Sequence, residues 1–519
     1  MSGPIVTTQG GALQGSAEGN LRVFRGIPYA QPPVGALRWK PPLPADRWNG
    51  VRDATEFGSA CFQPGAKLAP VYATAPMPMS EDSLTLNIWT PAAGENAPVF
   101  FWIHGGALWN GSSRDPLYDG RHLADLGLVV VSINYRLGVL GWLAHPELSA
   151  ESPEGTSGNY GLLDQIAALQ WVRQNIAAFG GDPSNVTIAG ESSGALSVMY
   201  LMASPAAKGL FAKAIAQSAY MITTPTLREE RHGVIAAEHS GRQLADALGK
   251  SNIAELRAMD PLELTHAAAA ARFPPLGVVD GLLLPDQLVA VFERGDQAHV
   301  PILAGFNSGE IRSLRMLAPP PPPTAADYEH AIRAAYGDLA DAFLQLYPSS
   351  DVQESIFAAT RDGSYGWTAE RLVRNQCTIG QRAYLYLFDH GYESARQMGL
   401  HAFHASEIPY VLGTREGTPP NWPKVPAASD EAALSRAMMA YWASFAREGR
   451  PVAPHQPTWP EYQGARGYMH FAEAPDAAAD LMPGMFELHE AVVGRRRADG
   501  RVAWNWNVGI AAPLPRPHR

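Results

Sequence analysis

The group in this chain best suited to nucleophilic chemistry is a serine with a glycine two residues away on either side. The sequence reads Gly-Glu-Ser-Ser-Gly at residues 190–194, which makes Ser192 the central serine. Glycines at these two positions allow a cramped backbone turn that exposes the serine hydroxyl at its tip. An apolar run precedes the turn and a helical pattern follows it. The backbone N–H of Ser193 is therefore expected at a helix N-terminus, where it can bind a developing negative charge.

A serine nucleophile also needs a base, an acid that orients the base, and an oxyanion hole. The sequence His-Gly-Gly-Ala at residues 104–107 directly follows an apolar run that ends at Ile103. A glycine-rich loop after an early strand can supply N–H groups to an oxyanion, because small residues let the substrate carbonyl approach the backbone. The alternative is a plain turn between a strand and a loop. The base should follow Ser192, with the acid between them, but many histidines satisfy that order.

Short apolar runs separated by helical patterns must position these groups. A helix is predicted where apolar residues recur at helical spacing between Leu162 and Phe179, and Gly180 and Gly181 then end it. Near-continuous apolar strands favour a parallel sheet that is covered on both faces, which gives an α/β layered fold. The predicted strands are residues 99–103, 128–133, 186–189, 301–304 and 384–388.

The composition narrows the class of protein. The chain has 519 residues, a net charge of −10 and no prominent Lys/Arg cluster, so nucleic acid and anionic membranes are poor candidate partners. No apolar run approaches a membrane-spanning length, and residues 1–7 lack the pattern of a cleaved secretory signal. Two cysteines, Cys61 and Cys377, cannot form a disulfide framework, so a cytoplasmic location is expected. Neither zinc-binding helix spacing nor a phosphate-binding loop is present, so no metal or cofactor is expected.

Ordered motifs extend this interpretation along nearly the whole chain. They include Phe-Arg-Gly-Ile-Pro-Tyr-Ala at 24–30, Ser-Glu-Asp-Ser-Leu-Thr-Leu-Asn at 80–87, Asn-Tyr-Arg-Leu-Gly at 134–138, Asn-Tyr-Gly-Leu-Leu-Asp-Gln at 159–165 and Gly-Gly-Asp-Pro at 180–183. On these motifs the chain resembles the type-B carboxylesterases, the group that includes para-nitrobenzyl esterases and cholinesterases. The resemblance implies an α/β-hydrolase fold, with a mostly parallel central sheet and insertions around the active site, as a single domain over residues 1–519.

The resemblance also selects the acid and the base. It implies that Glu310, in Gly-Phe-Asn-Ser-Gly-Glu at 305–310, is the acid, although in isolation this residue would be interpreted as a solvated loop carboxylate. It implies that His404 is the base. The rival is His401, three residues earlier, which lacks the following glutamate and apolar run at the right offsets.

Further roles follow from the same resemblance. The oxyanion donors match the backbone N–H groups of Gly106, Ala107 and Ser193. A buried polar network behind the histidine matches Glu191, Ser218 and Glu407, and such a network would hold the imidazole and tune its proton affinity. Two structural salt bridges are implied, Arg38 with Glu81 and Arg136 with Asp164.

The chain departs from the family pattern at three positions. Ser83 stands where the family often has cysteine, so the first disulfide is expected to be lost, with Cys61 left unpaired. Ser193 stands where alanine is usual, but its backbone N–H is unchanged. Ala107 stands where a third glycine is common, and its methyl group could narrow or reshape the site.

These features predict a serine carboxylesterase that works through a Ser-His-Glu triad and an acyl-enzyme. The expected partner is a small-molecule ester, and the expected assembly is a monomer or a small homo-oligomer. Two alternatives stay open: a non-catalytic adhesion or binding relative, and a different hydrolytic or lyase reaction on the same fold. The sequence leaves the natural substrate open.

Overall fold

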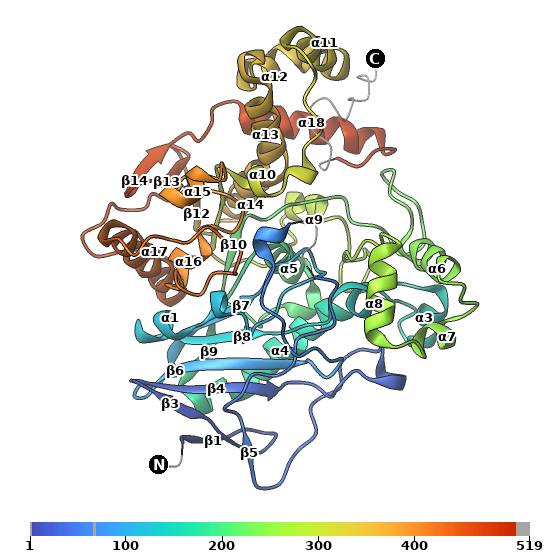
Figure 1. Cartoon of the computed structure of the whole chain (residues 1–519), viewed down its shortest axis with the longest axis vertical. Coiled ribbons are helices and arrows are strands. Elements are labelled where there is room, and N and C mark those ends of the chain that lie inside the picture. Colours follow the sequence, from blue (N-terminus) through green and yellow to red (C-terminus); the bar gives the residue numbers. More distant parts are fainter. Residues whose placement is uncertain (1–2, 66–68, 505–519) are drawn as a thin grey trace.

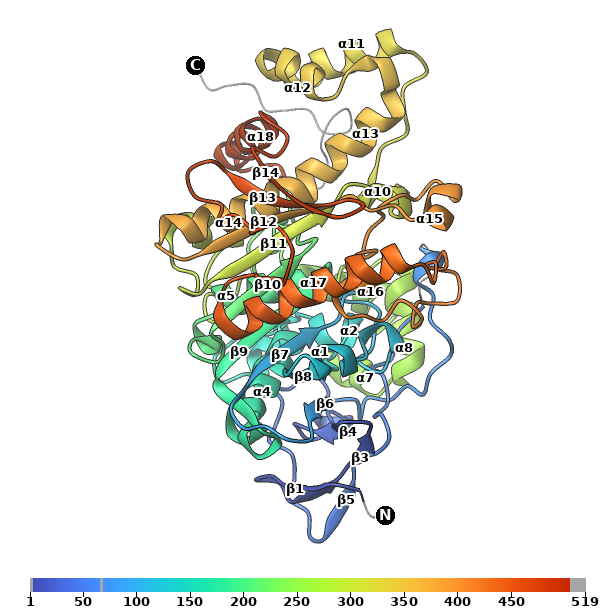
Figure 2. The ribbon, with the colours of Figure 1, turned by 90° about the vertical axis from the view of Figure 1, so that its left-hand side faces the viewer.

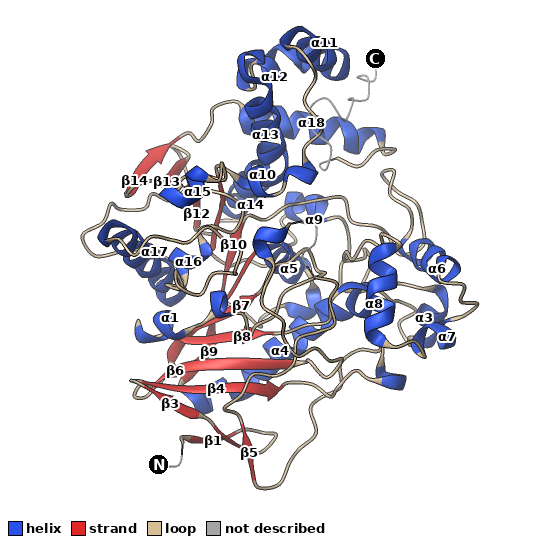
Figure 3. Cartoon of the chain, in the orientation of Figure 1, coloured by secondary structure: helices blue, strands red, loops and turns tan. Residues whose placement is uncertain are grey.

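A large mixed sheet forms the centre of the protein in the computed structural model, which describes residues 3–65 and 69–504 (Figures 1 and 3). The strands are β1 (Ile5–Thr7), β2 (Ala12–Gln14), β3 (Ser16–Glu18), β4 (Leu21–Pro28), β5 (Val51–Asp53), β6 (Thr85–Pro91), β7 (Ala97–Ile103), β8 (Val129–Ile133), β9 (Gly181–Glu191), β10 (Lys213–Gln217), β11 (Ile302–Asn307), β12 (Ala383–Phe388), β13 (Gly467–Phe471) and β14 (Pro475–Ala479).

The central sheet has 11 strands in the order β14-β13-β12-β11-β10-β9-β7-β8-β6-β4-β3. The pairings from β13 through to β8 are all parallel. Antiparallel pairing is confined to the two ends, where β14 joins β13 and where β6, β4 and β3 follow β8. The sheet is therefore mostly parallel, and a separate small sheet of β1, β2 and β5 lies beside its N-terminal end.

Helices cover both faces of the sheet (Figure 2). The α-helices are α1 (Arg121–Asp125), α2 (Gly138–Trp142), α3 (Pro146–Glu151), α4 (Tyr160–Asn175), α5 (Ser193–Ala203), α6 (Ala237–Ala247), α7 (Ile253–Arg257), α8 (Pro261–Ala270), α9 (Leu288–Arg294), α10 (Glu310–Ser313), α11 (Ala325–Tyr336), α12 (Ala340–Leu346), α13 (Val352–Arg361), α14 (Trp367–Thr378), α15 (Glu393–Gln397), α16 (Ile408–Val411), α17 (Ser429–Glu448) and α18 (Met485–Asp499). Both views place α11–α13 and α18 near β13 and β14, at the end of the sheet away from β1 and β5.

The alternation of side chains along β7 explains why its sequence is apolar throughout. Val99, Phe101 and Ile103 belong to one buried cluster, which includes residues of α4, α5 and α14. Phe100 and Trp102 point to the other face and belong to a second cluster, with residues of α1, α16 and α17. Successive side chains of a strand point to opposite faces, so a strand buried on both faces needs apolar residues at every position.

All five predicted strands are present. Three are longer than predicted, β8 begins one residue later than predicted, and β11 begins one residue later and ends three residues later. The predicted helix is also confirmed as α4, followed by a 3-10 turn at Ile176–Phe179, and Gly180 ends it with a φ of +87°. The strands not predicted from the sequence are β3, β4, β6, β10, β13, β14 and those of the small sheet. The proline run at 319–323 lies largely exposed between the 3-10 turn Arg315–Leu317 and α11.

Both implied salt bridges are present, and both are buried. Arg38 donates to the two carboxylate oxygens of Glu81 at 2.6 Å each. Arg136 forms a bidentate pair with Asp164 as well, with two hydrogen bonds of 2.7 Å. Cys61 and Cys377 are both free.

Candidate active site

The turn that carries Ser192 lies between β9 and α5, at the carboxyl edge of the parallel strands. Ser192 has φ +55° and ψ −121°, a conformation that side-chain-bearing residues rarely adopt. A Cβ atom added to Gly190 would lie 2.5 Å from the carbonyl carbon of Gly194, and one added to Gly194 would lie 2.1 Å from the Ile103 oxygen. The two glycines are therefore required because the backbones of the turn and of β7 approach closely.

Glu310 is the first residue of α10, just after the loop that follows β11, and His404 lies in the loop between α15 and α16. The N–H of Gly309 donates to the Ala402 carbonyl at 2.8 Å, which ties the two loops together. The Nδ1 atom of His404 lies 2.5 Å from Oε2 of Glu310, and both side chains are buried. The second Glu310 oxygen accepts a hydrogen bond from the Asn307 N–H at 2.8 Å, which fixes the carboxylate.

The other imidazole nitrogen faces a second carboxylate. The Nε2 atom of His404 lies 3.1 Å from Oε1 of Glu191, the residue before Ser192. The Ser192 hydroxyl makes no hydrogen bond to any residue that the structure describes, so Ser192 and His404 are not joined directly. Catalytic hydrogen bonds often form fully only in the substrate complex.

Two carboxylates around one imidazole change its proton affinity. Burial by itself lowers the pKa of His404, but Glu191 and Glu310 outweigh burial and raise that pKa to about 9. Burial raises the pKa of Glu191 to about 8, against the opposing effect of His404. A proton is thus held more tightly at this pair than at an ordinary histidine in water.

The expected oxyanion donors lie beside the serine. In the described part of the chain, nothing accepts a hydrogen bond from the backbone N–H of Gly106, Ala107 or Ser193. A Cβ atom added to Gly105 would lie 3.3 Å from Cβ of Ser192, so the loop runs directly past the nucleophile. Free N–H groups beside a serine hydroxyl are what a tetrahedral oxyanion requires.

The polar network behind His404 contains two residues that the sequence analysis missed. Glu407 accepts hydrogen bonds from the Asn307 side chain at 2.6 Å and from the Gln217 side chain at 2.9 Å. Asn307 thereby links Glu407 to Glu310. The Ser218 hydroxyl is buried and makes no hydrogen bond to a described residue, so the structure does not include it in this network.

Two tyrosines against His404 were also missed. The Tyr72 hydroxyl donates to the His404 carbonyl at 2.8 Å, and its ring meets the imidazole edge-on. Tyr365 lies in a π-helical turn, Asp362–Gly366, with its ring centroid 5.3 Å from that of His404. By contrast, the rival His401 is exposed and forms no ion pair with a carboxylate of the described chain.

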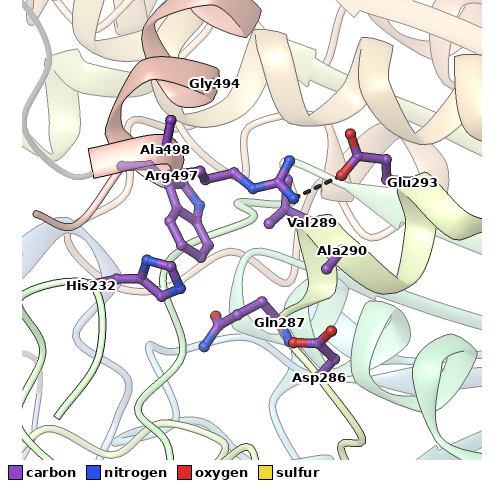
Figure 4. A pocket seen from close by; sticks show the side chains of 10 residues that line it. His232, Asp286, Gln287, Val289, Ala290, Glu293, Gly494, Arg497 and Ala498 are labelled. Carbon is purple, nitrogen blue, oxygen red and sulfur yellow. Dashed lines mark hydrogen bonds and ion pairs between the residues drawn. The ribbon is translucent and has the colours of Figure 1, made fainter. Parts of the chain in front are cut away.

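A cavity of about 470 Å³ lies elsewhere, between α9 and α18. Figure 4 shows His232, Gln287 and the ion pair of Arg497 with Glu293 along its walls, and that ion pair has a 2.7 Å contact. None of the expected catalytic groups lines this cavity.

Comparisons with known proteins identify the family. Residues 2–484 match the model of the carboxylesterase family. The chain belongs to this family. It is 36% identical over 495 residues to the fumonisin B1 esterase of Sphingopyxis macrogoltabida, covering 89% of this chain and 85% of the relative. It is 36% identical over 479 residues to the para-nitrobenzyl esterase of Bacillus subtilis (strain 168), covering 89% and 93%.

Solved structures agree with the sequence comparisons. A PNB esterase structure superimposes with a TM-score of 0.80 at 32% identity, covering 93% of this chain and 99% of that one. The carboxylesterase described here therefore has the α/β-hydrolase fold, and it is a carboxylic ester hydrolase. Within residues 3–65 and 69–504, no three His, Cys, Asp or Glu side chains are grouped to hold a metal ion. In the same ranges, no helix combines the length and apolarity needed to cross a membrane.

Proposed function

We propose that this carboxylesterase hydrolyses small-molecule esters through an acyl-enzyme formed on Ser192. The Ser192 oxygen attacks the ester carbonyl while His404 takes its proton. The tetrahedral intermediate collapses, and His404 returns the proton to the leaving alcohol. Water then attacks the acyl-enzyme with His404 again as the base, and the acid is released.

Glu310 has the orienting role in this proposal. Its carboxylate accepts the Nδ1–H of His404, which directs Nε2 toward the turn that carries Ser192 and stabilises the imidazolium as it forms. The observation that carries the proposal is the 2.5 Å contact of His404 with Glu310, buried beside the turn that bears Ser192. A buried carboxylate paired with a histidine next to a strained serine favours acyl transfer over a structural role.

The backbone N–H groups of Gly106, Ala107 and Ser193 act as the oxyanion hole. They carry no hydrogen bond to a described residue, so binding an oxyanion breaks no existing hydrogen bond. Glu191 and Glu407 surround the histidine and adjust its proton affinity.

The triad is tested by three substitutions. Ser192→Ala and His404→Ala should each reduce kcat by about 10⁴-fold or more, because triad residues act as a unit. His401→Ala is the matched control, since it removes an exposed imidazole three residues away and should leave hydrolysis of para-nitrophenyl acetate unchanged. Inactivation by His401→Ala with tolerance of His404→Ala would contradict the assignment of the base.

A panel of paired substrates tests the reaction class. An ester and the amide of the same acid should differ strongly, with the ester cleaved and the amide left intact. Absence of hydrolysis of any ester would favour a binding relative, and faster amide cleavage would favour a different hydrolase.

Three broader features are part of the same proposal. Residues 1–519 form one domain in this proposal, because the 11 strands of the central sheet come from segments spread between Ser16 and Ala479. The cytoplasmic location is supported by the presence of only two cysteines, neither of them bonded. A monomer or a small homo-oligomer is proposed, and sizing of the purified chain decides between them.

A further inference from the structure

The loop that carries two of the oxyanion donors has an unfavourable backbone conformation. Gly106, Ala107 and Leu108 all have positive φ, at +114°, +57° and +58°. Glycine adopts such angles freely, but Ala107 and Leu108 bear side chains that disfavour them. Two adjacent side-chain-bearing residues in the left-handed region persist only where surrounding contacts hold them.

Hydrogen bonds at both ends of the loop provide that restraint. The Tyr135 hydroxyl donates to the His104 carbonyl at 2.8 Å, before the loop. The Gly138 N–H donates to the Leu108 carbonyl at 2.7 Å, at its end. These two contacts tie the loop to the segment after β8, and the Tyr135 side chain also interacts with the side chain of Ser193.

The contact that joins the loop to the nucleophile helix is made by a side chain. The Leu108 N–H donates to the Ser193 hydroxyl oxygen at 3.1 Å, and both residues are fully buried. Ser193 is the first residue of α5 and directly follows Ser192. Its hydroxyl therefore joins the loop that carries two of the expected donors to the helix N-terminus that carries the third.

We propose that the Ser193 hydroxyl is a positioning group of the oxyanion hole, holding the strained Ala107–Leu108 backbone so that the Gly106 and Ala107 N–H groups face the oxyanion. This inference rests on the proposed function, because it concerns the geometry of the proposed oxyanion hole. Ser193 would contribute to that hole twice, through its backbone N–H as a donor and through its hydroxyl as a positioning group. Without the hydroxyl, the buried Leu108 N–H loses its acceptor. A rearrangement of the loop that gives this N–H another acceptor would then lower the free energy of the protein.

The test removes the acceptor in two ways. Ser193→Ala deletes the hydroxyl, and Ser193→Cys replaces it with a group of similar shape that accepts hydrogen bonds weakly. Each should lower kcat for para-nitrophenyl acetate by roughly 10-fold, less than the 10²–10³-fold that follows complete loss of a donor, with KM within about 2-fold. Effects on kcat alone are expected because the oxyanion exists only in the transition state.

Ser197→Ala is the matched control. Ser197 lies one turn further along α5, is equally buried, and its hydroxyl bonds to the Ser193 carbonyl and the Gln165 side chain at 3.0 Å each. The change deletes a buried serine hydroxyl from the same helix without touching the oxyanion loop. It should reduce thermal stability while kcat and KM stay within about 2-fold, as expected of a lost hydrogen bond remote from the reacting atoms.

Inhibition by a trifluoromethyl ketone distinguishes a positioning role of the Ser193 hydroxyl from a purely structural one. The inhibition constant would not change if the hydroxyl only stabilised the fold. The Ser192 oxygen adds to the carbonyl carbon of the ketone, His404 receives the serine proton, and the former carbonyl oxygen becomes an oxyanion in the hole. The inhibition constant should rise in Ser193→Ala by about the factor that kcat falls, because both report binding of the oxyanion.

Ala107→Gly tests the proposed cause. Glycine accepts the positive φ at this position, so the loop should depend less on the Ser193 hydroxyl. Ser193→Ala should then lower kcat by only about 2-fold in the Ala107→Gly background, a coupling that a double-mutant cycle measures directly.

Two results would overturn the inference. One is kcat and ketone affinity in Ser193→Ala and Ser193→Cys within about 2-fold of the parent enzyme. The other is a loss of equal size when Ser193→Ala is made in the parent enzyme and in the Ala107→Gly variant. Failure of the proposed function is recognised separately, since Ser192→Ala would then retain activity and the ketone would not bind covalently to Ser192.

Discussion

His404 is held between two carboxylates, and this arrangement determines the pH at which it can act as a base. Glu310 contacts Nδ1 and Glu191 contacts Nε2, so the protonated imidazole is stabilised on both sides. The sequence identified all three residues through the family resemblance. It did not reveal that Glu191 contacts the nitrogen that accepts the Ser192 proton in the proposed mechanism, because that contact depends on how the end of β9 meets the distant loop that carries His404.

The pH at which activity falls on the acid side should therefore be higher than it would be for an unperturbed histidine. Only neutral His404 can accept the proton of Ser192, so activity is lost as the pH falls through the pKa of His404. That pKa is raised to about 9, and the midpoint of kcat/KM should thus lie above the reference value of about 6.5.

Glu191→Gln isolates the cause of this shift. Removing the negative charge beside Nε2 favours the neutral imidazole, so the acid midpoint should move to lower pH. Glu263→Gln, which changes an exposed carboxylate on α8, is the control and should leave the midpoint in place. A midpoint near the reference value of about 6.5 in the parent enzyme, unchanged by Glu191→Gln, would show that Glu191 does not act on His404.

The elements show which parts of the fold could be predicted from sequence. Residues 99–103 were recognisable as a strand because both faces are buried and every position is apolar. The strand β10 was missed because Lys-Ala-Ile-Ala-Gln lacks the run of β-branched and aromatic residues that marks strands. The contact of Tyr72 with His404 joins residues 332 positions apart, and no local pattern reports such a contact.

Buried ion pairs hold the loops after the N-terminal strands. Arg136 and Asp164 are at most 3% exposed, whereas the pair of Arg333 with Asp341 is largely solvated. Arg136→Met leaves a buried carboxylate without its partner and should lower the free energy of unfolding by about 3–5 kcal/mol.

Arg333→Met is the matched control and should cost no more than about 1 kcal/mol, as expected for an exposed pair. Urea unfolding followed by fluorescence measures both variants. Equal shifts of the urea midpoint for the two variants would show that burial does not determine how much these ion pairs contribute to stability.

The whole molecule is stabilised by apolar cores on the two faces of one sheet. The largest clusters of buried residues lie on opposite sides of the same strands, and both cysteines are free. The layered architecture could be predicted because alternating apolar strands and helices have few other ways to bury both faces. The small N-terminal sheet could not, since its strands have only three residues each.

Stability should accordingly be independent of thiol redox state. Burial raises the pKa of the Cys61 thiol to about 12, which keeps it protonated and unreactive at neutral pH. Thermal melting with and without a strong reductant should give the same Tm. A clear fall of Tm on reduction would reveal a bond between Cys61 and Cys377, contrary to this account.

In the proposed mechanism a single serine, Ser192, forms the covalent intermediate. A chromogenic phosphonate ester tests it most directly, because it phosphonylates an activated serine and releases one equivalent of leaving group. One equivalent should be released per chain, with a matching loss of esterase activity and a mass increase confined to the peptide that contains Ser192. Full inactivation with the label on any other residue, or an active esterase that never takes up the label at Ser192, would contradict it.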